Sequence, residues 1–220
     1  MILFDQLLQF PLFLGMSRDD LSQVAGHTKF DFQKLASRSV LYHDGDVCDH
    51  LCFLLSGTVT VDTRSDDGTY TVTEQLSAPF MLQPESIFGY QQRYTHSFRA
   101  LTPVSLLRIH RSEVVRLTEQ FLIFRINLLN LLATRTQKLL HQPWRHCPQT
   151  LRERIIRFMA NRCIHPAGPK TFHILMTQLA AEVGDSRLDV SRALNDMQRD
   201  GLLTLHRGRI EVPHMERLLQ

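Results

Sequence analysis

Residues 176–195 read MTQLAAEVGDSRLDVSRALN, and this stretch has the spacing of two short helices joined by a tight turn. Ala180 is small at the point where the second helix would cross the first closely. Gly184, four residues later, can adopt the positive φ that such a turn requires. Ser186 then supplies a helix-capping hydroxyl. We therefore predict a helix-turn-helix motif.

The second helix of this motif, predicted over residues 186–199, has one apolar face. That face is formed at helical spacing by Val190, Ala193, Leu194 and Met197. The side chains on its outward faces are Arg187, Leu188, Ser191, Arg192 and Asn195. Because Ser186 caps the helix, the positive N-terminal end of the helix is available to meet a phosphate.

Two short strands are predicted after this helix, over residues 203–205 and 209–212. The turn between them is HRG at 206–208, and Arg209 follows it. It therefore offers three cationic or titratable side chains, those of His206, Arg207 and Arg209, as the wing of a winged helix does. An ordinary helical hairpin with a solvated basic face is the alternative. We favour the winged helix because four features agree at fixed spacing.

The charge of the 220-residue chain is unevenly distributed. From Arg145 onward there are twelve Lys and Arg against eight Asp and Glu, whereas residues 1–144 contain thirteen against fourteen. The net charge of +3 therefore comes from the last third, which indicates a polyanionic partner for that part. Hydrophobic residues make up 43% and charged residues 21%, and these values exclude a disordered or collagen-like chain.

Residues 29–109 have the texture of a β domain. Short runs rich in Val, Thr, Phe and Leu alternate with turn residues, which is typical of an all-β sandwich, roll or barrel. Residues 53–61 and 69–73 are expected to form a hairpin within it. In the preceding helical pattern, residues 5–26, Ser17 is expected to begin a helix.

Residues 112–141 are predicted to form one long helix that Ser112 caps and Pro143 stops. Its length of roughly 40 Å exceeds what a small β domain covers, since each residue adds about 1.5 Å. We expect its spare apolar face to pack against a second copy of the chain. The residues assigned to this contact are Phe121, Phe124, Leu128 and Leu131. The alternative is that the helix lies entirely on its own domain.

The tail of the chain contains Val-Gly-x-Ser-Arg-x-x-Val-Ser-Arg-x-Leu at 183–194 and Asp-Gly-Leu-Leu at 200–203. This tail resembles the DNA-binding domain of the cyclic-AMP receptor protein / FNR (Crp/Fnr) family of bacterial transcription regulators. The family's β-roll is similar to three further segments, which are PLF at 11–13, YHDGD at 42–46 and FLLSG at 53–57.

The resemblance covers essentially the whole chain and implies an α+β fold. It implies an N-terminal cyclic-nucleotide-binding-like β-roll, or double-stranded jelly roll, as the sensor (1–111), and then a long dimerisation helix (112–141). A C-terminal winged helix-turn-helix DNA-binding domain (142–220) follows, beginning with a linker at 142–148. A cytoplasmic homodimer bound to double-stranded DNA at an inverted-repeat promoter, in contact with RNA polymerase, is the expected assembly.

The resemblance also implies roles for single residues. Arg187 and Arg192 match the family's base-contacting pair, and an arginine fork fits the two major-groove acceptors of guanine. Leu188 stands where the family often has glutamate; it can touch a thymine methyl but cannot accept a hydrogen bond from cytosine. The predicted phosphate-contacting positions are Thr177, Gln178, Ser186 and His206. The predicted DNA-binding set also includes Ser191, Asn195 and Arg207.

The sensor half departs from the cyclic-AMP-binding pattern, a Gly-Glu-Leu/Ile-x turn followed by Arg-Ser/Thr-Ala. Here Tyr94 takes the arginine position, Thr95 takes the hydroxyl position, and Arg93 is displaced by one residue. A shift of one residue on a strand turns a side chain to the opposite face. We therefore expect a small-molecule effector other than cyclic AMP, or none. The candidate effector contacts are Arg93, Thr95, Arg99 and Phe88.

Other function classes find less support in the sequence. Cys48 and Cys52 lie near His43 and His50, but a single C-x₃-C pair is a weak metal motif, so we expect free thiols and no metal site. The His-x-His pair of a cupin-like metalloenzyme is missing, as are nucleophilic-serine, phosphate-loop and Rossmann motifs. The apolar run at 7–16 is too short to predict a membrane span, and no basic residue precedes it, so it does not indicate a secretory signal.

Three hypotheses follow, and in the first two the protein is not an enzyme. The leading one is a homodimeric DNA-binding regulator that responds to a ligand or another signal. The second is a regulator of the same build that binds DNA constitutively. The third, which the residues favour least, is a metal-dependent cupin-like enzyme with an appended helical domain.

Overall fold

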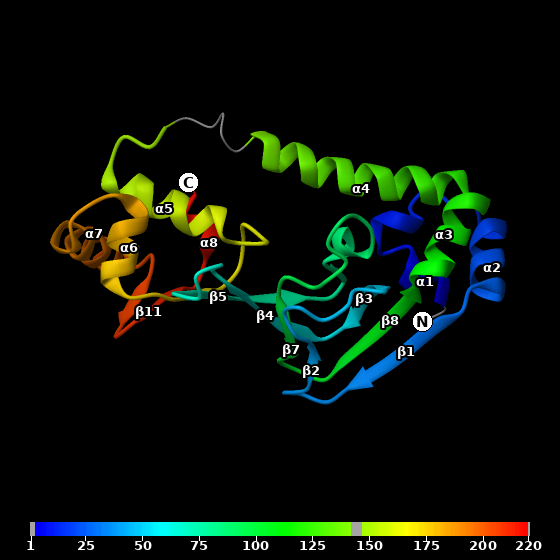
Figure 1. Ribbon diagram of the computed structural model, residues 1–220. Helices are drawn as coiled ribbons and strands as arrows, with labels where there is room; N and C mark the ends of the chain where they lie inside the picture. The colour runs from blue at the N-terminus through cyan, green and yellow to red at the C-terminus, as the bar shows by residue number, and fades with distance from the viewer. Residues whose placement is uncertain (1–2, 142–146, 220) are drawn as a thin grey trace. The chain divides into compact units, whose positions relative to one another are not determined.

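The computed structural model describes residues 3–141 and 147–219 and divides the chain into two compact units (Figure 1). The first, which we call the roll unit, comprises residues 1–59, 77–95 and 99–145. The second, the C-terminal unit, comprises residues 60–76, 96–98 and 146–220.

Three short helical segments begin the roll unit: α1 (Leu3–Leu7), the 3-10 helix η1 (Pro11–Phe13) and α2 (Arg18–His27). Ser17 caps α2, which confirms the prediction from the sequence. Its hydroxyl accepts a hydrogen bond from the Asp20 backbone N–H at 3.0 Å, and the Asp20 carboxylate accepts one from the Ser17 N–H at 3.3 Å. This capping box satisfies N–H groups that a helix start otherwise leaves without a partner.

A four-stranded antiparallel sheet with the order β1-β8-β3-β6 forms the centre of the roll unit. Its strands are β1 (Phe30–Leu35), β3 (His50–Ser56), β6 (Phe80–Leu82) and β8 (Val104–His110). Phe53 of β3 lies opposite Leu107 of β8 and Met81 of β6. The unit also contains β2 (Val40–Tyr42) and the 3-10 helix η2 (Pro84–Ile87).

Four phenylalanines join these elements into one core. The ring centroids of Phe10 and Phe53 are 4.9 Å apart in an edge-to-face contact, and those of Phe13 and Phe124 are 5.5 Å apart. All four rings are fully buried. Because each aromatic ring buries a large apolar area, this cluster fixes η1 and the helix that carries Phe124 on the sheet.

The long helix predicted over 112–141 is interrupted, and this corrects the sequence analysis. It consists of α3 (Arg111–Gln120) and α4 (Leu122–His141), because Phe121 has extended backbone angles between them. The first helix is capped by His110, whose Nδ1 accepts a hydrogen bond from the Ser112 N–H, and not by Ser112 as predicted. The predicted stop at Pro143 and most of the predicted linker lie outside the described residues.

The C-terminal unit combines a helical core with a sheet. Its helices are α5 (Leu151–Asn161), α6 (Met176–Val183), α7 (Arg187–Arg199) and α8 (Met215–Leu218). Its strands follow the order β10-β11-β9-β5-β4, with β7 next to β4. Their bounds are β4 (Thr58–Arg64), β5 (Thr71–Ser77), β7 (Ser97–Ala100), β9 (Lys170–His173), β10 (Thr204–His206) and β11 (Arg209–Val212).

The division of the chain into units does not follow chain order. The hairpin of β4 and β5 lies within the span predicted as the sensor domain, yet residues 60–76 belong to the C-terminal unit. The reason is that β5 pairs with β9 in antiparallel register, with Val72 opposite Phe172. Both side chains lie in the core of the C-terminal unit. In the described part of the chain, no helix has the length and apolar character needed to span a membrane.

The four cysteines are free thiols in different environments. Cys48 and Cys52 are buried in the roll unit, Cys163 is half-buried at the end of α5, and Cys147 is exposed. Burial raises the pKa of the Cys52 thiol to about 12. Burial, followed by the charge of Glu74, raises the pKa of Cys163 to about 12 as well. Burial also raises the pKa of Cys48.

These raised pKa values lead us to expect that only Cys147 reacts rapidly with iodoacetamide in the native protein at pH 8. A thiol with a pKa near 12 has a thiolate fraction on the order of 10⁻⁴ at that pH, and the thiolate is the nucleophile. Mass spectrometry of the alkylated peptides measures each site, and alkylation in urea, where all four should react, is the control. Labelling of Cys52 or Cys163 as fast as Cys147 would contradict this assignment.

Candidate nucleic-acid interface

The turn between α6 and α7 has the geometry predicted from the sequence. Gly184 has φ of 64° in the left-handed region, and its N–H donates to the carbonyls of Ala180 and Ala181. The N–H of Asp185 also donates to the Ala180 carbonyl at 3.0 Å. These bonds close α6 and direct the chain into α7, as expected for a helix that ends at a left-handed glycine.

Arg154 of α5 holds this turn from the side, a role that the sequence analysis did not identify. Its guanidinium donates to the carbonyl oxygens of Val183 at 2.8 Å and Gly184 at 3.1 Å. It also forms an ion pair with the Asp185 carboxylate at 2.5 Å. One side chain therefore satisfies carbonyls at the end of α6 and fixes the residue that leads into α7. An arginine on a helix carries no local sequence signal for such a contact.

Helix α7 is buried along one stripe and exposed along another, as predicted. Val190, Leu194 and Met197 have no measurable exposure, and Ala193 is half-buried. The exposed predicted DNA-contacting residues are Leu188, Arg192 and Asn195, which lie away from this stripe, and Arg187, which lies in the first turn of α7. Ser191 is half-buried, and its carbonyl accepts a hydrogen bond from the Asn195 amide at 2.7 Å.

Ser186 caps α7, which confirms the prediction. Its hydroxyl accepts from the Asp189 N–H at 3.1 Å and donates to the Asp189 carboxylate at 2.7 Å. The same carboxylate is 3.3 Å from the guanidinium of Arg192, whose side chain is 68% exposed. Asp189, which the sequence analysis left unassigned, thus joins the helix cap to a predicted base-contacting arginine.

The wing lies beside the start of α7. A cavity of about 310 Å³ is lined by Arg187, by His206 and Arg207 of the β10–β11 turn, and by residues at the start of α6. His206 and Arg209 both contact the Glu211 carboxylate, at 3.4 Å and 3.1 Å. Among residues 3–141 and 147–219, neither Arg187 nor Arg207 has an ion-pair partner. Two uncompensated cations therefore border the same hollow.

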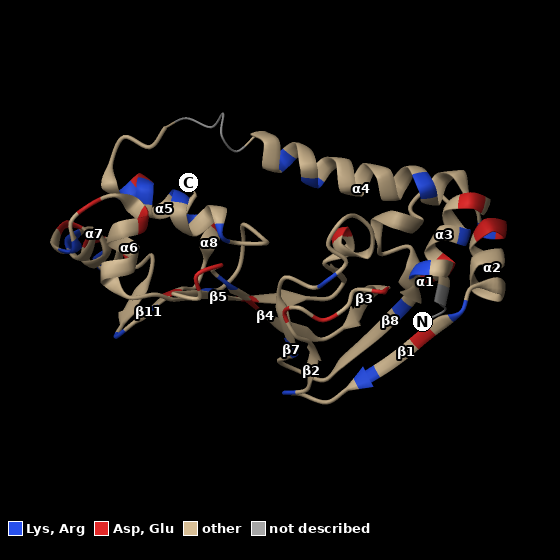
Figure 2. Ribbon diagram, in the orientation of Figure 1, with Lys and Arg blue, Asp and Glu red and all other residues tan. Residues whose placement is uncertain are grey.

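The predicted phosphate contacts at the start of α6 have different environments. Thr177 is exposed, whereas Gln178 is half-buried. The Gln178 side-chain oxygen accepts a hydrogen bond from the Leu175 N–H at 3.1 Å and so caps α6. Because this bond uses the side-chain oxygen, the NH₂ group remains as the hydrogen-bond donor of the Gln178 side chain. Figure 2 shows basic residues on α5 and α7 of the C-terminal unit.

The candidate effector residues lie on the outside of the roll unit. Arg93, Thr95 and Arg99 are exposed, and Phe88 is half-buried. The Arg93 guanidinium donates to the Gly45 carbonyl at 2.6 Å, and that of Arg99 donates to the Arg38 carbonyl at 3.3 Å.

Tyr94, between Arg93 and Thr95, points inward. Its ring is buried and stacks on Tyr42 with centroids 4.1 Å apart. Burial, and next the neighbouring Tyr42, raise the pKa of Tyr94 above its ordinary value. In the described part of the chain, no three His, Cys, Asp or Glu residues are grouped so as to hold a metal ion.

The residues predicted for dimerisation lie differently from the expectation. Phe121, Phe124 and Leu128 are buried in the roll unit, and Leu131 is half-buried. Asn127 holds α4 there by donating to the carbonyls of Leu12 and Leu14. This corrects the prediction that these four residues contact a second chain. Their helical periodicity marks the face of the helix that packs on the core of the same chain. The large apolar side chains that α4 exposes are Leu122, Ile123, Ile126, Leu129, Leu139 and Leu140.

Comparison with known families agrees with this architecture. The family model described as the cyclic nucleotide-binding domain matches residues 32–121. The model of the Crp-like helix-turn-helix domain matches residues 153–220. No curated protein compared with the chain matches it.

Several solved structures are similar in fold. The catabolite activator protein of Thermus thermophilus is 23% identical, with 96% of this chain and 97% of that chain covered at a TM-score of 0.52. A transcriptional regulator of the crp/fnr family from Eubacterium rectale is 21% identical, with 96% and 97% covered at a TM-score of 0.54. The sensor domain of the transcriptional regulator DNR from Pseudomonas aeruginosa is 21% identical, with 68% and 95% covered at 0.54.

The two family matches together cover more than half of the chain, and they coincide with a β-roll and with a winged helix that exposes basic residues on its second helix. The chain therefore belongs to the Crp/Fnr family of DNA-binding transcription regulators.

Proposed function

We propose that the protein is a homodimeric regulator that binds an inverted-repeat DNA site through α7 and the wing and responds to a signal other than cyclic AMP. The observation that carries this proposal is a pair of exposed cations, Arg187 and Arg207, which have no ion-pair partner in the described part of the chain and lie at one hollow beside the capped start of α7. Uncompensated cations beside a helix N-terminus favour a phosphate-bearing partner.

Arg187 and Arg192 are the proposed base-contacting residues. Both are exposed. Arg192 lies on the side of α7 opposite its buried stripe, and Arg187 lies in the first turn, at the end of the helix whose side chains reach base edges when a recognition helix enters the major groove. The exposed pair of Arg192 with Asp189 is weak, since solvated ion pairs contribute roughly 0–1 kcal/mol. A guanine edge can therefore replace that carboxylate. Leu188, 60% exposed, supplies an apolar contact that suits a thymine methyl.

Thr177, Gln178, Ser186, His206 and Arg207 are the proposed phosphate contacts. They lie at the starts of α6 and α7 and in the wing turn, where backbone N–H groups and cations are found together. The Gln178 side-chain oxygen is already occupied, so its NH₂ group would donate to phosphate. Such contacts set the register on the duplex without distinguishing sequence.

A second copy of the chain is the proposed partner of α4. Leu122, Ile126 and Leu129 are 58%, 45% and 61% exposed and lie on the helix side away from the roll's core. Apolar side chains repeating at three- and four-residue steps along a 20-residue helix are suited to pairing with the same helix of another chain. Two-fold pairing would present two α7 helices to an inverted repeat.

The roll does not fit cyclic AMP, because the groups at the phosphate-binding position are bonded to one another. The Gln83 side chain is buried; it donates to the Ser86 hydroxyl at 2.5 Å and accepts from the Thr95 N–H at 3.0 Å. The Tyr94 ring fills the interior, and Arg93 is turned outward. A different effector would meet the exposed side chains of Arg93, Thr95 and Arg99 and the edge of Phe88.

Replacing Arg187 by alanine is expected to lower affinity for the preferred duplex by roughly 1–3 kcal/mol and to relax base preference. Competition between specific and random duplexes at two salt concentrations measures both effects. Arg199→Ala is the control, because Arg199 is exposed at the far end of α7 and pairs with Asp196. An equal loss for specific and random DNA would remove Arg187 from base recognition.

Replacing Ile126 by glutamate is expected to give monomers, because a charge would be buried between two α4 helices. Sedimentation velocity at micromolar concentration measures the mass. Ile126→Leu, which keeps the apolar volume, should remain dimeric. A wild-type protein that sediments as a 25.5 kDa monomer would contradict the proposed dimer.

Calorimetric titration of the wild-type protein with cyclic AMP is expected to show no heat of binding. The physical reason is that the Gln83 side chain already bonds the Ser86 hydroxyl and the Thr95 backbone N–H. The unfolding temperature should also be the same with and without the nucleotide, since a ligand that binds only the folded state raises the stability of the protein. Saturable binding at micromolar nucleotide would show that this segment rearranges.

A further inference from the structure

The β4–β5 hairpin supplies a strand to the sheet of the C-terminal unit. Strand β5 pairs with β9 over four consecutive positions, from Thr71 opposite His173 to Glu74 opposite Lys170. On its other side β9 pairs with β11 of the wing. Strand β9 is therefore covered along both edges, and β5 reaches the wing through a single intervening strand.

An ion pair without solvent exposure lies at one end of this pairing. The Lys170 ammonium is 2.9 Å from the Glu74 carboxylate, and both side chains are 0% exposed. The Glu74 carboxylate also accepts from the backbone N–H groups of Ile164 at 2.6 Å and His165 at 3.2 Å. Lys170 donates in addition to the Ala167 carbonyl at 2.9 Å. Two buried charges are thus paired and hydrogen-bonded, which is the condition under which burial is tolerated.

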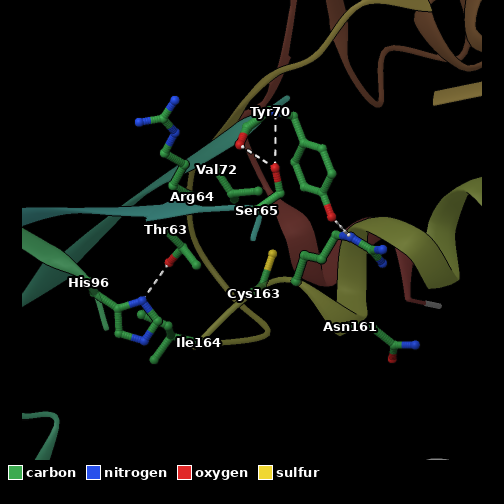
Figure 3. Close-up of a pocket in the computed structure, with 10 residues that line it drawn as sticks. Thr63, Arg64, Ser65, Tyr70, Val72, His96, Asn161, Cys163 and Ile164 are labelled. Atoms are coloured by element: carbon green, nitrogen blue, oxygen red, sulfur yellow. Dashed lines mark hydrogen bonds between the residues drawn. The ribbon is translucent and has the colours of Figure 1, made fainter. Parts of the chain in front are cut away.

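A second polar contact fixes the other end of the hairpin. The Tyr70 hydroxyl accepts from the Arg162 guanidinium at 2.5 Å, and Arg162 also binds the Glu182 carboxylate of α6 at 2.5 Å. A cavity of about 300 Å³ is lined by Ser65 and Tyr70 of the hairpin and by Cys163 and Ile164 after α5. Figure 3 shows these four side chains around it. Arg162 therefore connects the hairpin directly to the first helix of the helix-turn-helix.

The hairpin leaves the DNA-contacting side chains exposed. Among the described residues, the hydrogen bonds and ion pairs that the hairpin makes in the C-terminal unit go to the end of α5, the loop after it, β9 and His96. The cavity at the hairpin and the hollow at Arg187 and the wing share no residue. Pairing of β5 with β9 is therefore compatible with a duplex bound on α7.

We propose that Glu74 and Lys170 are a positioning pair, which keeps the β4–β5 hairpin as a permanent strand of the C-terminal unit and so holds β9 and, through it, the wing strand β11 in place. The chain supports this, because residues 60–76 belong to the C-terminal unit although they lie between two segments of the roll unit. The inference rests on the proposed function, since its consequence is a fixed position of the wing on DNA.

The first experiment measures the pairing itself in the full-length protein without DNA. Hydrogen exchange of the β5 amides should become faster in Glu74→Gln and in Lys170→Met, because each leaves a buried charge without its partner. The double variant Glu74→Gln/Lys170→Met removes both charges and keeps one acceptor oxygen, which can bond the Ile164 N–H, so most of the protection should return. Gln75→Ala, at the exposed neighbouring residue, is the control. Unchanged exchange in both single variants would overturn the proposal.

A cross-link tests the pairing without weakening the fold. Thr71 lies opposite His173, and neither side chain is buried. Opposite residues in antiparallel strands are roughly 4.5–5.5 Å apart at Cα, within the range of a disulfide. Thr71→Cys/His173→Cys, made with Cys147→Ser, should form this bond on mild oxidation. Failure to form it would show that β5 and β9 are not paired in solution.

The closing experiment measures affinity for inverted repeats whose half-site spacing varies. Each single variant should lose about tenfold of the preference for the best spacing, because a loosely held wing no longer fixes the register of α7 on its half-site. The double variant and the oxidised cross-linked protein should keep that preference. If the pair only stabilised the fold, the single variants would change thermal unfolding and leave the preference for spacing unchanged. Loss of DNA binding on oxidation, restored by reduction, would overturn the proposal by showing that the hairpin must leave β9.

These readouts separate the inference from the proposed function. If the wild-type protein binds no duplex, the proposed function fails. The exchange and cross-linking results then still decide whether the hairpin is a strand of the C-terminal unit.

Discussion

The buried pair of Glu74 and Lys170 is the constraint on which the C-terminal unit depends. Each charge alone would cost several kcal/mol to remove from water, so neither residue is tolerated in this core without the other. Because Glu74 comes from the hairpin and Lys170 from β9, the winged-helix sheet is complete only with residues 60–76 present. The exposed cations of α7 and the wing lie on a sheet and helix core that this pairing holds together.

Charge is used in opposite ways in the two units. In the C-terminal unit, acidic groups fix the frame: Asp185 holds Arg154 against the turn, and Glu211 holds the wing, while Arg187 and Arg207 have no ion-pair partner among the described residues. In the roll unit, the Gln83 side chain is buried and bonds the Ser86 hydroxyl and the Thr95 N–H, and the buried Tyr94 ring stacks on Tyr42. Polar groups of the roll unit are thus bonded to one another, whereas the C-terminal unit leaves two cations exposed.

Local patterns in the sequence were sufficient to predict the helix-turn-helix. The left-handed Gly184, the Ser186 cap and the buried stripe of α7 each depend on residues a few positions apart, and all are confirmed. Contacts between distant residues were not predictable, because neither Glu74 nor Arg154 differs in local context from a solvated side chain. The apolar period of α4 marked a helix but did not distinguish the face on Phe13 from the exposed one. The break at Phe121, a buried residue with extended backbone angles, carries no breaker residue in the sequence and was not predicted.

The central claim is that a two-fold symmetric protein contacts bases through α7. Selection of bound duplexes from a random library by the wild-type protein, followed by sequencing, tests it most directly. The account predicts enrichment of an inverted repeat with half-sites about one helical turn apart, roughly 34 Å, and with a conserved guanine in each half-site. Enrichment of an asymmetric single site, or of no sequence at all, would contradict it.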